Sequence, residues 1–79
     1  MLYRVYFSSK NRNTSDKSEI FPTRCDAKKF LQTVPHGYIL SYSKKGVDIL
    51  GYKDFEPSQE ENVKINSILD SWEIFKSLG

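Results

Sequence analysis

The sequence predicts a small α+β domain in which two helices pack on one face of a three-stranded antiparallel sheet. Three segments alternate apolar and polar residues at the period of a strand, and two segments repeat apolar residues at the period of a helix, in the order β-α-β-β-α. A chain of 79 residues is expected to form a single domain, residues 1–79. A tight hairpin and the right-handed crossover rule favour a split β-α-β arrangement with strand order 1-3-2.

The first element is a strand at residues 2–7. Aromatic and branched residues dominate it, and alternation places Tyr3, Val5 and Phe7 on the face that the helices cover. Residues 8–19 contain no apolar side chain, so we expect a flexible polar loop at residues 8–20 that joins this strand to the first helix. An arm that becomes ordered on a partner is the alternative for this loop.

The first helix is expected over residues 24–34. Thr23 is a suitable N-cap, and Asp26 follows at the third helical position. Apolar residues then recur at helical spacing, and Pro35 ends the helix. The recurring apolar residues are Ala27, Phe30, Leu31 and Val34.

The middle of the chain predicts a β-hairpin. Residues 38–43 and 47–53 both alternate as strands do, and the short connection between them contains Gly46, which suits a left-handed position.

The last helix opens with a capping box, in which Ser58 is followed by Glu61, and it is expected to run to about Ser77. One apolar stripe faces the sheet. Val63 and Ile74 lie near the opposite side, where they are either ordinary exposed side chains or a patch that binds a partner or a second copy. The stripe consists of Ile65, Ile68, Leu69, Trp72 and Phe75.

Residues that carry enzyme chemistry are sparse. Cys25 is the only cysteine, which excludes an internal disulfide or a multi-thiolate metal site and suits the reducing cytoplasm where we expect the protein. His36 is the only histidine, and no metal-ligand spacing, catalytic constellation or glycine-rich phosphate loop accompanies it. No segment reaches the length of a membrane span. We therefore expect no enzymatic activity, no cofactor, no metal and no membrane partner.

The sheet face that the helices leave open is the first candidate binding surface. Alternation leaves two tyrosines, an arginine and two aliphatic residues there, a composition typical of protein-binding surfaces. The first two strands are also expected to be sheet edges, which can pair with another chain. The predicted open-face residues are Arg4, Tyr6, Ile39, Leu50 and Tyr52.

Binding of single-stranded nucleic acid is the alternative. Residues 1–53 carry ten basic against four acidic residues, a net charge of +6, whereas residues 54–79 carry two against six, a net charge of −4. Basic side chains in the expected flexible segments can reach phosphates, and Tyr6 or Tyr52 can stack on bases. These basic residues are Lys10, Arg12, Lys17, Lys44 and Lys45.

The octamer KGVDILGY resembles the third strand of the RNA-recognition motif at Lys45, Gly46 and the closing Tyr52. The resemblance implies a split β-α-β fold in which aromatic residues of two strands stack on bases. Val47 and Ile49 occupy the positions of those aromatic residues, so we do not assign the chain to this family.

Composition also suggests a class of protein. A short chain that is rich in Lys, Asn, Ile, Tyr and Phe and poor in catalytic residues is similar to the small accessory proteins with which bacteriophages of AT-rich genomes inhibit host factors, including host defences. This analogy, which no motif carries, favours a non-enzymatic binding module that acts as a stoichiometric inhibitor of a host protein. Formation of a homodimer and sequestration of a small ligand such as a nucleotide remain alternatives.

Overall fold

The computed structural model describes the backbone of residues 2–78 and the side chains of residues 2–70. Within that range the chain forms two helices and a four-stranded antiparallel sheet, which confirms the predicted class of small α+β domain. Neither described helix is long and apolar enough to cross a membrane. The elements are, in order, β1 (Leu2–Ser8), β2 (Lys17–Phe21), α1 (Arg24–Thr33), β3 (His36–Ser43), β4 (Gly46–Lys53) and α2 (Gln59–Leu78).

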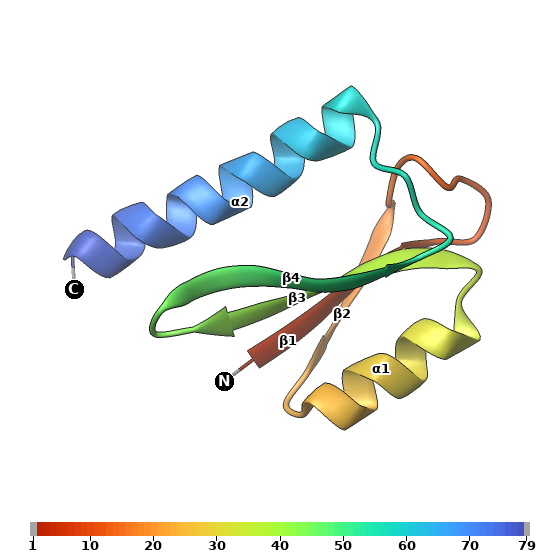
Figure 1. Cartoon of the computed structure of the whole chain (residues 1–79), viewed down its shortest axis with the longest axis horizontal. Helices are drawn as coiled ribbons and strands as arrows, with labels where there is room; N and C mark the ends of the chain where they lie inside the picture. The colour runs from red at the N-terminus through yellow and green to blue at the C-terminus, as the bar shows by residue number, and fades with distance from the viewer. Residues whose placement is uncertain (1, 79) are drawn as a thin grey trace.

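The sheet has the strand order β2-β1-β3-β4, so the predicted three-stranded order 1-3-2 is wrong (Figure 1). β1 lies in the interior of the sheet and is antiparallel to both β2 and β3, with Leu2 opposite Tyr42 and Ser8 opposite His36. The crossover through α1 therefore joins β2 to β3 and passes over β1. A split β-α-β unit does occur, but it starts from a strand that the sequence pattern does not predict.

That additional strand lies in the polar stretch, which is therefore not a flexible loop throughout residues 8–20. The end of the stretch, together with Ile20 and Phe21, forms β2, which pairs with β1 in an antiparallel register that places Lys17 opposite Phe7. Pairing uses main-chain N–H and C=O groups, so an edge strand can form while side chains such as Lys17 and Glu19 stay exposed. A polar edge strand shows no apolar alternation, which is why the sequence pattern misses it.

The loop between β1 and β2 is bonded to the segment that leads into α2. The backbone N–H groups of Glu56 and Ser58 donate to the carbonyl oxygens of Arg12 and Asn13, both at 2.8 Å. The Arg12 guanidinium also lies 2.8 Å from Asp54 Oδ1. These contacts hold the loop against the body of the domain.

Helix α1, the hairpin of β3 and β4, and the start of α2 agree with the prediction. α1 ends one residue before the predicted boundary, and the Thr23 hydroxyl caps its start by accepting from the Asp26 N–H at 3.2 Å. β3 and β4 form the predicted hairpin, and Gly46 has a φ of +138°, which favours glycine. The Ser58 hydroxyl caps α2 by accepting from the Glu61 N–H at 3.2 Å.

The two helices cover opposite faces of the sheet, so the prediction that both pack on one face is wrong (Figure 1). The reason lies in the two central strands, which are apolar on both faces. Val5 and Tyr6 in β1 are 0% and 6% exposed, and Ile39 and Leu40 in β3 are 2% and 0% exposed. Because neighbouring strand residues point to opposite faces, such strands need a cover on each side. The buried cluster under α1 contains Tyr3, Val5, Ala27, Leu31, Val34 and Ile39, and the cluster under α2 contains Tyr6, Tyr38, Leu40, Phe55 and Ile65.

Candidate functional site

The five residues predicted for an open sheet face do not share one surface. Tyr6 is buried beneath α2, so its side chain is not available to a partner, and Ile39 is buried beneath α1, where only 2% of it is exposed. Arg4 is half-buried, with its guanidinium carbon 5.1 Å from the centre of the Tyr6 ring and a guanidinium N–H donating to Ser18 Oγ at 3.0 Å. The expectation of an uncovered face is wrong, because each face carries a helix.

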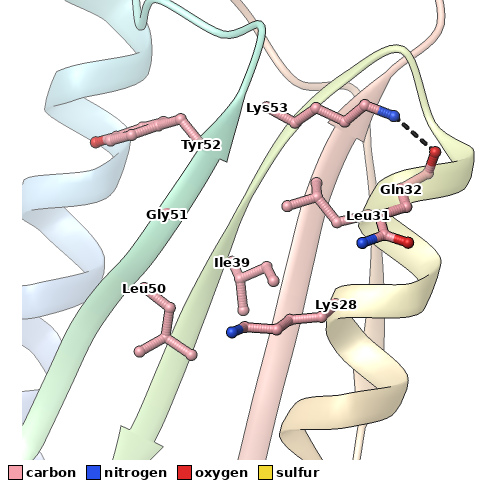
Figure 2. Close-up of a pocket in the computed structure, with 8 residues that line it drawn as sticks. All are labelled: Lys28, Leu31, Gln32, Ile39, Leu50, Gly51, Tyr52 and Lys53. Carbon is pink, nitrogen blue, oxygen red and sulfur yellow. Dashed lines mark hydrogen bonds between the residues drawn. The ribbon is translucent and has the colours of Figure 1, made fainter.

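Three of the predicted residues meet instead at a groove between α1 and β4, with a volume of about 310 Å³ (Figure 2). Leu31, Ile39 and Leu50 form its apolar floor, and the Tyr52 ring points away from it toward the opposite side of the sheet. The groove therefore combines a hydrophobic surface with direct access from solvent. Its lining residues are Lys28, Leu31, Gln32, Ile39, Leu50, Gly51, Tyr52 and Lys53.

The groove exists because α1 packs mainly on the other three strands, whereas α2 packs on β4 from the opposite face. An irregularity in β4 also contributes to the groove between α1 and this strand. Ile39 pairs with Gly51 and Leu40 pairs with Ile49, which leaves Leu50 as an extra residue in a β-bulge. A Cβ placed on Gly51 would have no neighbouring atom within 4 Å. A side chain from another molecule therefore has open space beside Gly51.

Two lysines give the groove a positive rim. Lys53 Nζ donates to the carbonyl oxygen of Gln32 at 2.6 Å and bridges one end of the groove (Figure 2). Lys28 is exposed on the α1 side. Among the residues whose side chains are described, no carboxylate lines the groove. The positive charge favours a bound molecule that places an acidic group beside the apolar floor.

β4 is an edge of the sheet in the described part of the chain, because β3 is its one paired neighbour there. Two large side chains on this edge strand are accessible: Ile49 is 37% exposed and Tyr52 is 47% exposed. A strand edge offers N–H and C=O groups that can pair with another strand. We refer to the groove and this edge together as the β4 site.

The sequence pattern predicts only part of the β4 site, namely Ile39, Leu50 and Tyr52. The groove depends on the lateral offset of α1 and on a bulge, and neither appears in a pattern of alternation. The residues of the site that the sequence pattern does not indicate are Lys28, Leu31, Gln32, Ile49, Gly51 and Lys53. One signal was present: a glycine inside a strand pattern, here Gly51, often marks a bulge.

The second predicted patch is separate from the β4 site. Val63 is 63% exposed and lies on the side of α2 away from the buried residues Glu61 and Ile65. The side chain of Ile74 lies outside the described residues. The patch therefore stays a prediction at both positions.

The five basic residues predicted to contact nucleic acid lie at opposite ends of the sheet. Lys10, Arg12 and Lys17 are at the end where β1 connects to β2, and Lys44 and Lys45 are in the turn between β3 and β4. Because β3 is antiparallel to β1, these ends are about 20 Å apart along strands of this length. Arg12 is moreover paired with a carboxylate. The five side chains do not form one basic surface.

A second polar cluster joins the loop before β2 to β3 and α2. Glu61, only 3% exposed, accepts from the Tyr38 hydroxyl at 2.5 Å and from the Ser15 N–H and hydroxyl at 3.0 and 2.7 Å. Lys64 Nζ lies 3.7 Å from the same carboxylate and donates to Ser15 Oγ at 3.1 Å. This cluster, which we call the Glu61 network, connects three elements that are distant in sequence.

The Glu61 network shifts the pKa values of its members. Burial alone would raise the pKa of Glu61, but hydrogen bonds from Tyr38 and Ser15, together with the Lys64 charge, outweigh burial and hold that pKa below its ordinary value. Burial, followed by the hydrogen bond to Glu61, raises the pKa of Tyr38. Burial and the neighbouring Tyr42 raise the pKa of Tyr6 to about 12. At neutral pH the carboxylate is therefore ionised and both tyrosines are neutral.

Among the described residues, no group of three His, Cys, Asp or Glu side chains is arranged to hold a metal ion. Comparisons of the chain with protein-family models, curated proteins and solved structures find no match. The functional conclusion therefore rests on the geometry and chemistry of the β4 site.

Proposed function

We propose that this chain is a non-enzymatic protein-binding module, which takes an extended segment of a partner along β4 and places one of its side chains in the groove. The observation that supports this function is the juxtaposition of an accessible strand edge with an apolar groove that is open beside Gly51. Strand addition of this kind gains affinity from main-chain hydrogen bonds and specificity from pockets for alternate side chains.

The chemistry of the groove specifies the kind of segment. The floor of Leu31, Ile39 and Leu50 suits a large apolar side chain. Lys28 and Lys53 favour an acidic residue one or two positions away in the bound segment. Binding of this kind needs no catalysis, since occupying a surface is sufficient to inhibit the partner, and a host protein is the partner class that we propose.

The test is a selection of peptides from a random display library on the immobilised protein, with two matched variants. Gly51→Leu puts a side chain into the groove where the structure has open space. Asn66→Leu adds the same side chain at an exposed position of α2. We expect the wild type and Asn66→Leu to enrich peptides with apolar and acidic residues in an extended pattern, and Gly51→Leu to lose them. Equal enrichment by Gly51→Leu would contradict the proposed function.

A further inference from the structure

The bulge in β4 determines which face each residue of this edge strand occupies. Asp48, Gly51 and Lys53 are opposite Ser41, Ile39 and Gly37 of β3, respectively. Alternation along β3 places these three residues on the α1 face. Leu50, the extra residue, also packs against the cluster under α1.

Two other residues of β4 occupy the opposite face. Ile49 is opposite Leu40 and Tyr52 is opposite Tyr38, and both partners belong to the cluster under α2. From Asp48 to Lys53 the faces therefore follow the series α1, α2, α1, α1, α2, α1. This series is unchanged when it is read backward, so the strand segment is complementary to itself in an antiparallel pair.

We propose that the β4 edge pairs with β4 of a second copy of this chain, in the antiparallel register that places Asp48 opposite Lys53 of the second copy. The proposal rests on the proposed function in that it uses the same strand edge; the strand that pairs there is β4 of a second copy instead of a segment of a host protein. A two-fold axis perpendicular to the sheet relates the copies, so each pair of residues occurs twice.

This register matches charge, hydrophobicity and size at successive positions. The Asp48 carboxylate faces the Lys53 ammonium group of the other copy, and both lie on the α1 face. The exposed side chains of Ile49 and Tyr52 face each other across the axis on the α2 face, where pairing removes both from water. Leu50 faces Gly51 of the other copy, where the structure has space for a side chain.

Neighbouring registers lack this agreement. A shift by one residue in one direction puts Ile49 opposite Gly51, which lies on the other face. A shift in the other direction puts Leu50 opposite Tyr52, which is again a mismatch of faces. The bulge, which usually obstructs pairing at a sheet edge, here selects one register in which two bulges meet.

The test exploits the charge pair. Sedimentation equilibrium over a wide range of protein concentration should show a monomer–dimer equilibrium for the wild type. Asp48→Lys places two lysines opposite each other twice, and Lys53→Asp does the same with two aspartates. We expect each single variant to weaken the dimer about tenfold, which corresponds to about 1.4 kcal/mol. The double variant restores opposite charges at both positions and should recover the wild-type dimer.

An equimolar mixture of the two single variants gives a sharper outcome. In a mixed pair, the lysine introduced at position 48 of one copy faces the aspartate introduced at position 53 of the other. The unchanged Lys53 of the first copy faces the unchanged Asp48 of the second, so a heterodimer should form from two variants that associate weakly alone. Circular dichroism and thermal unfolding of each variant control for the hydrogen bond to Gln32 that Lys53→Asp removes.

A wild type that stays monomeric at millimolar concentration would overturn the dimer, and so would a dimer that neither single reversal weakens. Both outcomes are distinct from failure of the proposed function. The peptide selection reports on strand capture at the groove, whether or not a second copy binds there. A dimer that follows the charge pattern, together with no peptide enrichment, would confine the β4 site to self-association.

Discussion

Replacement of Glu61 by glutamine tests how the domain holds its polar loop in place. The carboxylate accepts three hydrogen bonds, one from the Tyr38 hydroxyl and two from Ser15. A glutamine side chain has nearly the same shape, but it places an NH₂ group where one of the two carboxylate oxygens stood. At least one buried donor then loses its acceptor.

The magnitude follows from the kind of hydrogen bond that is lost. Hydrogen bonds to a charged group contribute about 1.5–3 kcal/mol, so we expect Glu61→Gln to lower the free energy of unfolding by about 2 kcal/mol at pH 7. For a domain of this size that corresponds to a fall in Tm of about 10 °C. Glu60→Gln is the matched control, since Glu60 lies in the same first turn of α2 but is exposed. Its effect should stay within about 0.5 kcal/mol.

The difference in the free energy of unfolding between the wild type and Glu61→Gln should depend on pH, with a defined sign. Because the pKa of Glu61 is lower in the folded protein than its ordinary value of 4.5, its stabilising contribution is present above pH 4.5 and is lost as the pH falls through the folded-state pKa. Urea unfolding of the wild type and Glu61→Gln at several pH values measures it. A difference that stays constant between pH 7 and pH 3, or a stability unchanged by Glu61→Gln, would refute the role of the Glu61 network.

Three further predictions concern the backbone, the tyrosines and the loop. Gly37→Ala puts a Cβ 2.6 Å from the carbonyl oxygen of Tyr6 and should lower stability by about 2 kcal/mol, whereas Gly51→Ala should raise it by about 0.5 kcal/mol; thermal unfolding of the pair measures both. Above pH 10 the unfolded state ionises Tyr6 before the folded state does, so Tyr6 should contribute a fall in stability of about 1.4 kcal/mol per pH unit up to about pH 12. Tyr6→Phe should make the slope in urea unfolding shallower by that amount and leave the slope that Tyr38 contributes. Deletion of residues 10–18 removes the start of β2 and the bonds to the segment before α2, so the melting transition should broaden or disappear; an unchanged transition would show that the loop is only a connector.

Strong local signals in the sequence account for the parts of the fold that were predicted. Thr23 and Ser58 are side-chain caps that act within three residues, and Gly46 meets a backbone requirement at a single position. Such signals do not depend on distant parts of the chain. They therefore predict α1, the β3–β4 hairpin and the start of α2 correctly.

The remaining features depend on tertiary contacts. β2 is held by main-chain pairing with β1, so its polar side chains carry no strand signal. Val5 and Tyr6 are both apolar, and alternation alone assigns only one of them to the core, whereas the structure buries both. If only the face that carries Val5 belongs to the core, both helices must cover that face and the other face stays open. The prediction of an open face therefore depends on treating Tyr6 as exposed. No sequence pattern indicates the groove, because it arises from the bulge at Leu50 and the offset of α1.

Chemical-shift mapping tests the central claim, that the β4 site is the surface at which this protein binds another chain. The measurement titrates ¹⁵N-labelled protein with a peptide from the display selection and follows backbone amide resonances in two-dimensional NMR spectra. The largest shifts should occur from Ile49 to Lys53 and at Lys28, with little change in β2 or at Val63. Shifts confined to β2 or to the outer side of α2, with β4 unchanged, would contradict the claim.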